Sequence, residues 1–296
     1  MASVAKGSLF PVELVSEVFS KAKGHSSIAR LSNQIPVPFS GNEIMTFSLD
    51  NDVSIVAEGD AKPAGDATMG SVTIQPIKVV YQARVNDEFV HCAEEKRLNY
   101  LQAFTDGFAK KIARGLDIMA FHGLDPKTLT ASQLIGTNSL DTNTNVGTET
   151  YSSGSEEADI TAAIADIGDY DCTGIAMSKV FASALANTTL SGGQRPYEDF
   201  MWGGNPGAVR GIPADVNSTV SAKASSDTVL KYAYVGDFAN AFKWGYAENI
   251  PMEVIEYGDP DGAGDLKRKN QVLLRCEAYI GWGILDPTAF SRIVSA

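Results

Sequence analysis

The feature that most constrains the fold is a long helical signal between Asn86 and His122. Asn86 is a favourable N-cap, and the two acidic residues after it suit a helix N-terminus. An unbroken helix of this extent would be roughly 55 Å long, beyond the width of a compact small domain. We therefore expect an elongated body. The apolar residues behind the signal recur at spacings of three, four or twice four: Phe89, Ala93, Leu101, Phe104, Phe108, Ile112, Leu116 and Met119.

The stretch before this helix predicts an extended β-hairpin with a loose tip. From Glu43 to Val85 the chain is β-like, and the β-branched runs Val53–Val56 and Val72–Ile74 flank a segment rich in Gly, Asp and Ala. An isolated hairpin is marginal in water, so another surface must cover it. Nothing in the stretch has the pattern of a catalytic or ligand-binding device.

The rest of the chain alternates helical and strand patterns. Helices are expected at 11–24, 156–167 and 179–187, and a second long hairpin is expected around the turn at 258–269. No Lys or Arg lies between 128 and 178, so we expect a strongly acidic surface there. The acidic residues of that region are Asp141, Glu149, Glu156, Glu157, Asp159, Asp166, Asp169 and Asp171.

The composition is that of an ordinary folded protein, with 44% hydrophobic and 20% charged residues. A net charge of −12 argues against a nucleic-acid-binding protein, which needs a basic face to displace counterions. No apolar run reaches the roughly 18 residues of a membrane span, and the N-terminus lacks a secretory signal. The three cysteines are too far apart for a disulfide framework or a zinc knuckle, so a reducing cytoplasm is the expected place of synthesis.

The histidines and cysteines do not form a reactive set. His25, His91 and His122 share no metal-ligand spacing, so satisfied or surface histidines are expected rather than a metal site. Cys92 stands near two glutamates, which would raise rather than lower a thiol pKa. We expect it to be a small core residue.

The remaining motifs also fail as chemical sites. Asp259 opens a run that resembles a calcium loop. However, Ala263 has no side-chain oxygen at position five, and Asn270 stands at position twelve, where the loop needs a bidentate Glu. The glycine clusters match no phosphate-binding loop. We therefore expect no catalytic residue, no cofactor site, no metal site and no enzyme activity.

The order of the parts resembles the major capsid proteins of tailed phages, whose fold is named after phage Hong Kong 97. The resemblance spans nearly the whole chain, because the pieces follow one another in the family's order. The matching pieces are FPVELVSEVF, SSIARL, VAEGDAKP, VTIQPIKVVYQARVNDEFV before the long helix, and RCEAYIGWGILDPTAFSRI near the C-terminus.

The resemblance implies an α+β chain with the Hong Kong 97-type capsid fold. Its expected parts are an N-terminal arm, an extended β-hairpin loop, a peripheral domain with a long spine helix, and an axial α/β domain. In that order they occupy 1–39; 40–85; 86–135 with 250–283; and 136–249 with 284–296.

The function implied is that of a major capsid protein, or major head protein. Its copies would self-assemble as pentamers and hexamers into the icosahedral shell that encloses the double-stranded DNA of a tailed bacteriophage. The protein would be part of the virion and would assemble in the host bacterial cytoplasm. Expected partners are a portal, a possible decoration protein and a separate scaffolding protein, because little chain precedes Pro11. Packaged DNA would be enclosed without sequence-specific binding.

The resemblance also implies inter-subunit contacts at two places. The first is the tip of the extended loop, with Glu58 and Lys62, where a solvated lysine is expected rather than an isopeptide cross-link. The second is the hairpin turn that meets symmetry mates around local threefold axes. The expected contact residues of that turn are Asp259, Asp261, Lys267, Arg268 and Lys269.

Two other functional classes stay open at this point. An encapsulin-type nanocompartment shell resembles the same fold but encloses an enzyme cargo. A soluble enzyme would instead need a pocket of converging polar groups.

Overall fold

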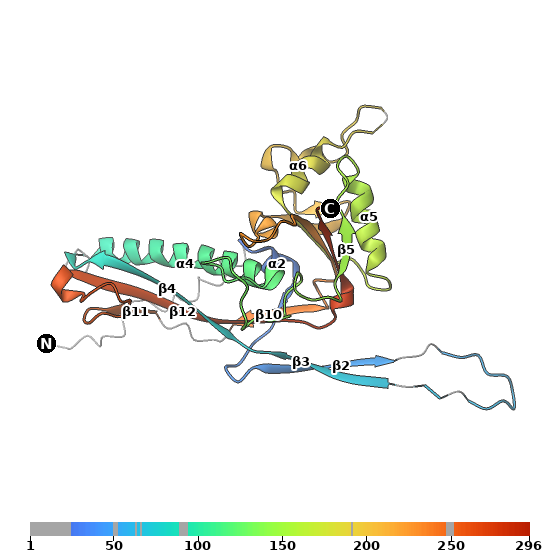
Figure 1. Ribbon diagram of the computed structural model, residues 1–296, viewed down its shortest axis with the longest axis horizontal. Helices are drawn as coiled ribbons and strands as arrows, with labels where there is room; N and C mark the ends of the chain where they lie inside the picture. Colours follow the sequence, from blue (N-terminus) through green and yellow to red (C-terminus); the bar gives the residue numbers. More distant parts are fainter. Residues whose placement is uncertain are drawn as a thin grey trace.

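The protein is elongated, with a β-hairpin projecting from its body (Figure 1). The expected helix at 11–24 and the expected positions Phe89, Cys92 and Ala93 lie outside the part of the chain that the structure describes. The computed structural model describes residues 25–49, 53–62, 64–65, 67–88, 94–190, 192–246 and 252–296.

A five-stranded sheet, which we call the first sheet, forms the long body. Its central strand is β12, which pairs antiparallel with β4 on one side and with β10 and β11 on the other. The short strand β1 pairs in parallel with β10 at the edge. The strands are β1 (Asn33–Gln34), β4 (Ile77–Asn86), β10 (Phe242–Tyr246), β11 (Met252–Ile255) and β12 (Gln271–Ile284).

The first sheet has one apolar and one polar face because its strands alternate. Val79, Tyr81 and Ala83 of β4 stand opposite Ala278, Cys276 and Leu274 of β12. These side chains pack with the buried face of α4 (Glu94–His122), a helix of 29 residues that lies along the sheet (Figure 1). The opposite face carries charged pairs such as Lys78 with Glu277, 2.7 Å apart.

The long helix is thus confirmed from Glu94 to His122. The assignment of Asn86 as its N-cap stays a prediction, because residues 89–93 lie outside the described part of the chain. Asn86 is the last residue of β4 and pairs with Gln271, because the strand ladder continues to that point.

The projecting hairpin consists of β2 (Asn42–Leu49) and β3 (Ala67–Ile74). Its eight-residue ladder runs from Asn42 opposite Ile74 to Leu49 opposite Ala67. The strand expected at Val53–Val56 is wrong, because those residues lie beyond the ladder and form no strand. The chain passes from β3 into β4 over two residues, so the hairpin is a direct extension of the first sheet.

A six-stranded sheet, the second sheet, forms the other lobe, in the order β5-β13-β9-β6-β8-β7. The helices expected at 156–167 and 179–187 are confirmed as α5 (Glu156–Asp166) and α6 (Lys179–Asn187). Ser178 caps α6, since its hydroxyl accepts from the Phe181 N–H. The strands are β5 (Gly147–Thr150), β6 (Gly174–Met177), β7 (Ala208–Val209), β8 (Ile212–Val216), β9 (Lys231–Gly236) and β13 (Phe290–Val294).

The acidic stretch contributes less surface charge than its sequence indicates. Glu156 and Asp159 are buried, with 2% and 7% exposure, whereas Asp166 is exposed and accepts a hydrogen bond from a serine of β13. The expected strongly acidic surface is therefore wrong for part of this region. Asp169 and Asp171 are exposed and remain available to it.

A buried carboxylate joins the two lobes. Asp117 of α4 is fully buried and accepts hydrogen bonds from the Ser26 hydroxyl and from the N–H groups of Ser27 and Ile28. These residues open the short helix α2 (Ser27–Leu31). On the other side it accepts from the Thr219 hydroxyl at 2.7 Å, in the 3₁₀ turn η2 (Ser218–Ser221).

A second carboxylate holds the same helix from the second sheet. Asp215 of β8 accepts from the Ser27 hydroxyl and pairs with Arg30 at 2.5 Å. The short helix α2 is therefore fixed between α4 and the second sheet by two acidic side chains from different elements. Because an unpartnered buried polar group is costly, these contacts specify one placement of α2.

This geometry predicts a pH dependence of stability that Asp117→Asn removes. Burial raises the pKa of Asp117 from 3.8 to about 6. Between these values the folded state holds a proton that the unfolded chain has released. The free energy of unfolding should then fall as pH rises from 4 to 6, by up to about 3 kcal/mol from this group.

Urea unfolding at several pH values between 4 and 7 measures this effect. The Asp117→Asn variant should show a flatter profile than the wild type, whereas the exposed control Asp169→Asn should follow the wild type. Parallel profiles for the wild type and the Asp117→Asn variant would contradict the assignment.

Candidate assembly surfaces

The β2–β3 hairpin exposes an apolar face that no described element covers. Met45, Phe47 and Met69 are 68%, 63% and 66% exposed. Phe47 stands directly opposite Met69, and Met45 lies two residues away on the same face. Val53 and Ile55, beyond the ladder, are fully exposed. Contiguous apolar surface of this kind marks a site that is covered by another molecule.

The predicted contact residues Glu58 and Lys62 lie in the connection between β2 and β3. Both are exposed, and no hydrogen bond or ion pair joins either side chain to the described part of the chain. The connection lies at one extreme of the long axis of the protein (Figure 1). Both side chains are therefore free to meet another subunit.

The predicted contact residues Asp259 and Asp261 are engaged within the subunit. Arg84 of β4 donates from Nε to Asp261 at 2.8 Å and from Nη2 to Asp259 at 3.3 Å. The same guanidinium donates to the carbonyl of Gly264 at 2.8 Å. The hydrogen bond from Arg84 lowers the pKa of Asp261 to about 2. These carboxylates therefore stabilise the turn within the subunit, and a contact with another subunit would have to leave or share their bonds to Arg84.

Two of the three basic residues in this turn also have internal partners. Lys267 lies 3.5 Å from a carboxylate oxygen of Asp87, and its Nζ is 5.1 Å from the centre of the Tyr257 ring. Lys269 donates to the carbonyl of Ala263. Arg268 is exposed, and its guanidinium forms no hydrogen bond or ion pair with a described side chain.

The two groups of predicted contact residues do not meet within one subunit. The turn lies near the end of β11 and β12, at the opposite extreme of the long axis from the hairpin tip (Figure 1). A contact between them needs two copies of the chain. Such a head-to-tail contact would join different patches, and it generates a ring if its rotation closes and an open filament if it does not.

The turn does not form the calcium loop that its aspartates resemble. Asp265 accepts from the Arg268 N–H at 2.9 Å, and the other two carboxylates face the guanidinium of Arg84. In the described ranges no group of three or more His, Cys, Asp or Glu side chains is placed to hold a metal ion.

Arg84 and Asp117 are the important residues that the sequence did not reveal. Arg84 stands between Ala83 and Val85 at the end of a strand, which indicates only that it faces away from the core. Its partners lie about 175 positions further along the chain. They become neighbours only through the ladder of β4 and β12, in which Arg84 pairs with Leu273.

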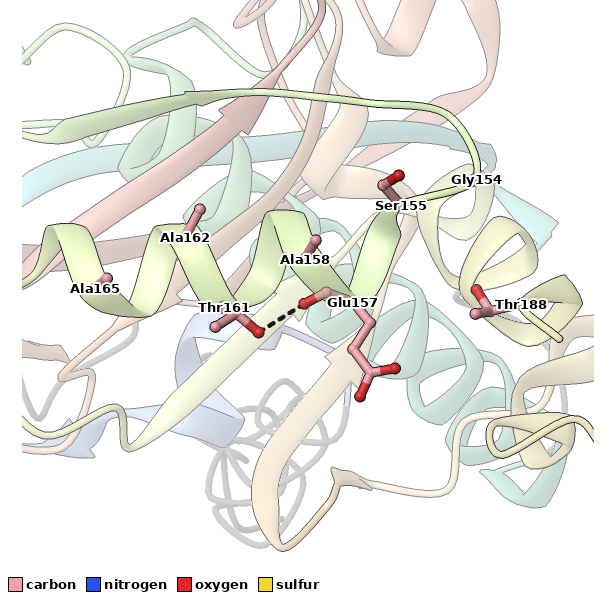
Figure 2. A pocket seen from close by; sticks show the side chains of 8 residues that line it. All are labelled: Gly154, Ser155, Glu157, Ala158, Thr161, Ala162, Ala165 and Thr188. Carbon is pink, nitrogen blue, oxygen red and sulfur yellow. Dashed lines mark hydrogen bonds between the residues drawn. The ribbon is translucent and has the colours of Figure 1, made fainter. Parts of the chain in front are cut away.

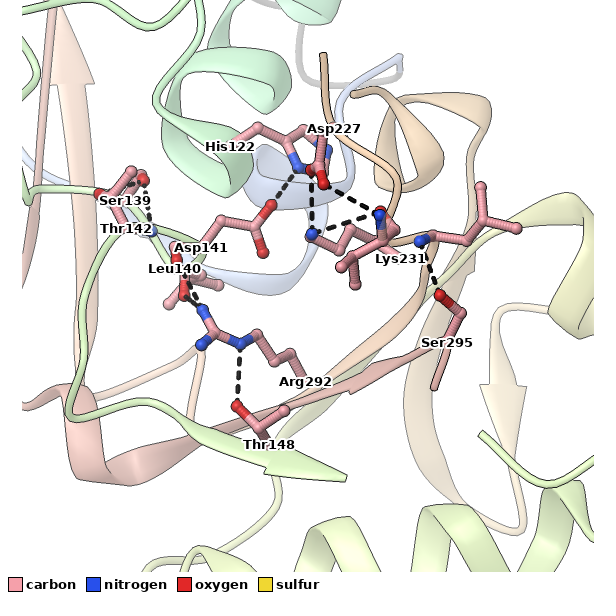
Figure 3. A network of polar contacts seen from close by, with 12 residues as sticks. His122, Ser139, Leu140, Asp141, Thr142, Thr148, Asp227, Lys231, Arg292 and Ser295 are labelled. Carbon is pink, nitrogen blue, oxygen red and sulfur yellow. Dashed lines mark hydrogen bonds and ion pairs between the residues drawn. The ribbon is translucent and has the colours of Figure 1, made fainter. Parts of the chain in front are cut away.

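His122 lies in a buried hydrogen-bond network that stabilises the fold (Figure 3). His122 is 5% exposed, with Nδ1 2.7 Å from Asp141 and Nε2 2.9 Å from the carbonyl of Thr219. The hydroxyl of Tyr234 donates to Asp141 at 2.8 Å, and burial raises the pKa of Tyr234. The expectation of satisfied or surface histidines is confirmed for His122 and for the exposed His25. His91 lies outside the described residues.

Arg292 extends this network to the edge of the second sheet. It lies on β13 and donates to the carbonyls of Leu140 and Asp141 at 3.0 and 2.6 Å. Its Nε donates to Thr148 at 3.0 Å (Figure 3). These bonds fix the loop after α4 to two strands, so the network supports the junction of the two lobes.

A shallow open groove runs along α5 (Figure 2). Thr161 donates its hydroxyl proton to the backbone carbonyl of Glu157, and the Glu157 carboxylate pairs with Arg210 at 2.8 Å. These lining side chains do not converge on a common point, unlike those of an enzyme site. The lining residues are Gly154, Ser155, Glu157, Ala158, Thr161, Ala162, Ala165 and Thr188.

No helix within the described residues is both long and apolar enough to cross a membrane.

Comparison with known proteins agrees with this geometry. A sequence profile of the phage capsid family matches residues 6–295. A solved chain of Mycobacterium phage Ogopogo is 32% identical, with a TM-score of 0.77 and 92% of each chain covered. A chain of Gordonia phage Cozz is 26% identical, with a TM-score of 0.70, covering 92% of this chain and 87% of its own. The "Probable major capsid protein gp17" of Mycobacterium phage L5 is 25% identical, covering 99% of this chain and 91% of that protein.

An elongated mixed α and β subunit with an uncovered projecting hairpin has the form of a structural protein that assembles with other subunits. The match over residues 6–295 then assigns it: the chain belongs to the phage capsid family.

The hydrogen bonds from Arg84 to the turn at 258–269 lead to a prediction. Arg84→Met should free the segment 258–264, so that the amides of Ala263 and Gly264 exchange about tenfold faster or more, because charge-assisted hydrogen bonds are lost. The pKa of Asp261 should return toward its ordinary value. The stabilising contribution of Asp261, which is present above pH 3.8 and lost as pH falls toward 2, should also disappear.

Hydrogen exchange of the full chain measures the first effect. Arg268→Met is the matched control, because it removes an arginine of the same turn that has no described side-chain partner. Equal exchange in both variants would mean that Arg84 does not hold the turn.

Proposed function

We propose that this chain is a major capsid protein whose copies self-assemble into the icosahedral head of a tailed bacteriophage and enclose its double-stranded DNA genome. The observation that carries the proposal is the β2–β3 hairpin. Its apolar face is not covered by the described part of the subunit, and its tip lies at the opposite extreme from the turn with which copies would meet. Membership of the phage capsid family and the similarity to the "Probable major capsid protein gp17" of Mycobacterium phage L5 support it.

In this proposal the fold is of the Hong Kong 97 type. The β2–β3 hairpin is the extended loop, α4 is the spine helix of the peripheral domain, and the second sheet with α5 and α6 is the axial domain. The amphipathic first sheet supports the assignment, because α4 covers one of its faces along much of the body. The proposed domain boundaries are those expected from the sequence.

The assembly follows from head-to-tail contacts between copies. The apolar face of the hairpin would be covered by a neighbouring subunit, which removes several large side chains from water. Glu58 and Lys62 at the hairpin tip, and Asp259, Asp261 and 267–269 in the turn, would make further contacts. Each contact is small, but a closed shell repeats all of them, so pentamers and hexamers become stable together.

The same proposal includes the partner proteins of the shell and the place where it assembles. The shell would take a portal, a scaffolding protein and a decoration protein, and would form the virion after assembly in the host cytoplasm. An encapsulin-type shell with an enzyme cargo is the alternative. The relatives from phages of Mycobacterium and Gordonia favour the phage capsid.

Negative-stain electron microscopy of the purified protein, with nuclease protection on the same fractions, tests the proposal. Icosahedral shells from phage-producing cells should contain nuclease-resistant DNA. Shells with a co-purifying enzyme and no DNA would favour the encapsulin alternative. Small particles in all conditions, including those with a phage scaffolding protein, would contradict a capsid function.

Deletion of Asp60–Ala67 should leave a soluble, folded subunit that assembles poorly, because the hairpin could no longer reach its neighbour. Circular dichroism would report the fold and sedimentation the yield of shells. A matched control replaces the same residues by a Gly/Ser segment of equal length, which restores reach without the original side chains. Normal shell yield from the deletion would refute the role of the hairpin.

A further inference from the structure

The outer face of α4 carries a row of cations, which we call the basic ridge: Lys96, Lys110, Lys111 and Arg114. All four are exposed. Lys110 and Arg114 lie 14 and 18 residues after Lys96, which places the three in one line on a helix with 3.6 residues per turn, and Lys111 lies beside that line. The buried residues of α4 lie on the opposite side, against the first sheet.

The described side chains do not neutralise the ridge. Asp106, on the flank of the ridge, is half-buried, and Asp117 is fully buried and engaged by α2. Among the side chains whose placement the structure describes, the ion pairs include none of the four cations. The polar face of the first sheet differs, because its cations have acidic partners, such as Lys78 with Glu277. A local excess of positive charge therefore remains on a chain of net charge −12.

The ridge is open and lacks the features of a protein-docking surface. All four cations are exposed, and in Figure 1 the side of α4 that faces away from the first sheet carries no other described element along its first half, to which Lys96 belongs. Tyr100 is the large exposed hydrophobic residue of the described helix, at 48% exposure. Protein interfaces depend on a buried apolar or aromatic centre, which this row of cations does not supply.

The shape of the ridge suits a rod-like polyanion. The distance along the helix from Lys96 to Arg114 is about 27 Å at 1.5 Å per residue. Exposed Ala103 and Gly107 lie between the cations, so the helix surface is low there and a backbone can approach closely. DNA presents one phosphate charge about every 1.7 Å of its axis, so several phosphates lie within reach of the ridge.

We propose that the basic ridge of α4 contacts the phosphate backbone of double-stranded DNA, without reading its sequence. The inference rests on the proposed function, which encloses DNA in the shell. Lysine and arginine side chains bind phosphates as charges and hydrogen-bond donors that carry no sequence information. The negative charge elsewhere on the subunit keeps the contact weak and salt-sensitive, which is compatible with a genome that must leave the shell.

The test uses the full-length protein, at a concentration below that of shell assembly, and a fluorescein-labelled random duplex of about 30 base pairs. Fluorescence anisotropy is measured over a range of salt concentrations. For three to four phosphates neutralised, the slope of log K against log salt should be about −3. Lys110→Gln, Lys111→Gln and Arg114→Gln together should reduce it to about −1 and weaken binding at low salt by about tenfold or more.

A matched control carries Lys179→Gln, Arg195→Gln and Lys223→Gln, which remove the same charge from the second lobe. It should bind like the wild type. Glutamine keeps high helix propensity, and circular dichroism would check that α4 is retained. Absence of duplex binding by the wild type at low salt, or equal slopes for the two triple variants, would overturn the proposal.

Shell formation is scored separately so that the two proposals can fail independently. If the wild type forms shells but does not bind the duplex, the capsid function stands and the ridge proposal fails. If the ridge variant binds DNA like the wild type but no longer assembles, the ridge is a contact with an acidic surface of another subunit. Salt-dependent duplex binding by a protein that never forms shells would support the ridge and contradict the capsid function.

Discussion

The ladder between β4 and β12 is the constraint on which the rest of the structure depends. It aligns ten residue pairs from Gln271 opposite Asn86 to Ile280 opposite Ile77, and so fixes which side chains face α4. A shift by one residue would turn the apolar set to water. Because β3 leads into β4 over two residues, the same ladder also sets the direction of the projecting hairpin. One register thus determines both the core and the direction of the exposed apolar face that we propose for assembly.

The two lobes are joined by an apolar core and by buried polar contacts. One buried cluster contains side chains of α4, β12, β9 and β13, so the core passes from the first sheet to the second. Asp117, Asp215 and the His122 network add directional bonds at the same junction. Directional bonds specify one relative placement, whereas apolar contacts alone tolerate several. The chain therefore gains a rigid junction beside a hairpin that it leaves uncovered.

Local patterns predicted the elements well where the side chains alternate against one core. The helices α4, α5 and α6 followed from apolar spacing, and the resemblance of ordered segments indicated the capsid family before the fold was known. A strand was wrongly predicted at Val53–Val56, because β propensity does not show whether a partner strand exists. The hydrogen bonds of Arg84 and Asp117 were also not predicted from the sequence. Each joins groups more than 80 positions apart, and only the tertiary register brings them together.

The exposed face of the β2–β3 hairpin has a chemical consequence. Two of its three large side chains, Met45 and Met69, are thioethers. While a subunit is free they are open to oxidants, and a sulfoxide would make polar a surface whose burial needs it to be apolar. In the assembly that we propose, a neighbour covers the face and oxidants lose access. The interval between synthesis and incorporation is therefore a period of redox vulnerability that ends when the subunit joins its neighbours.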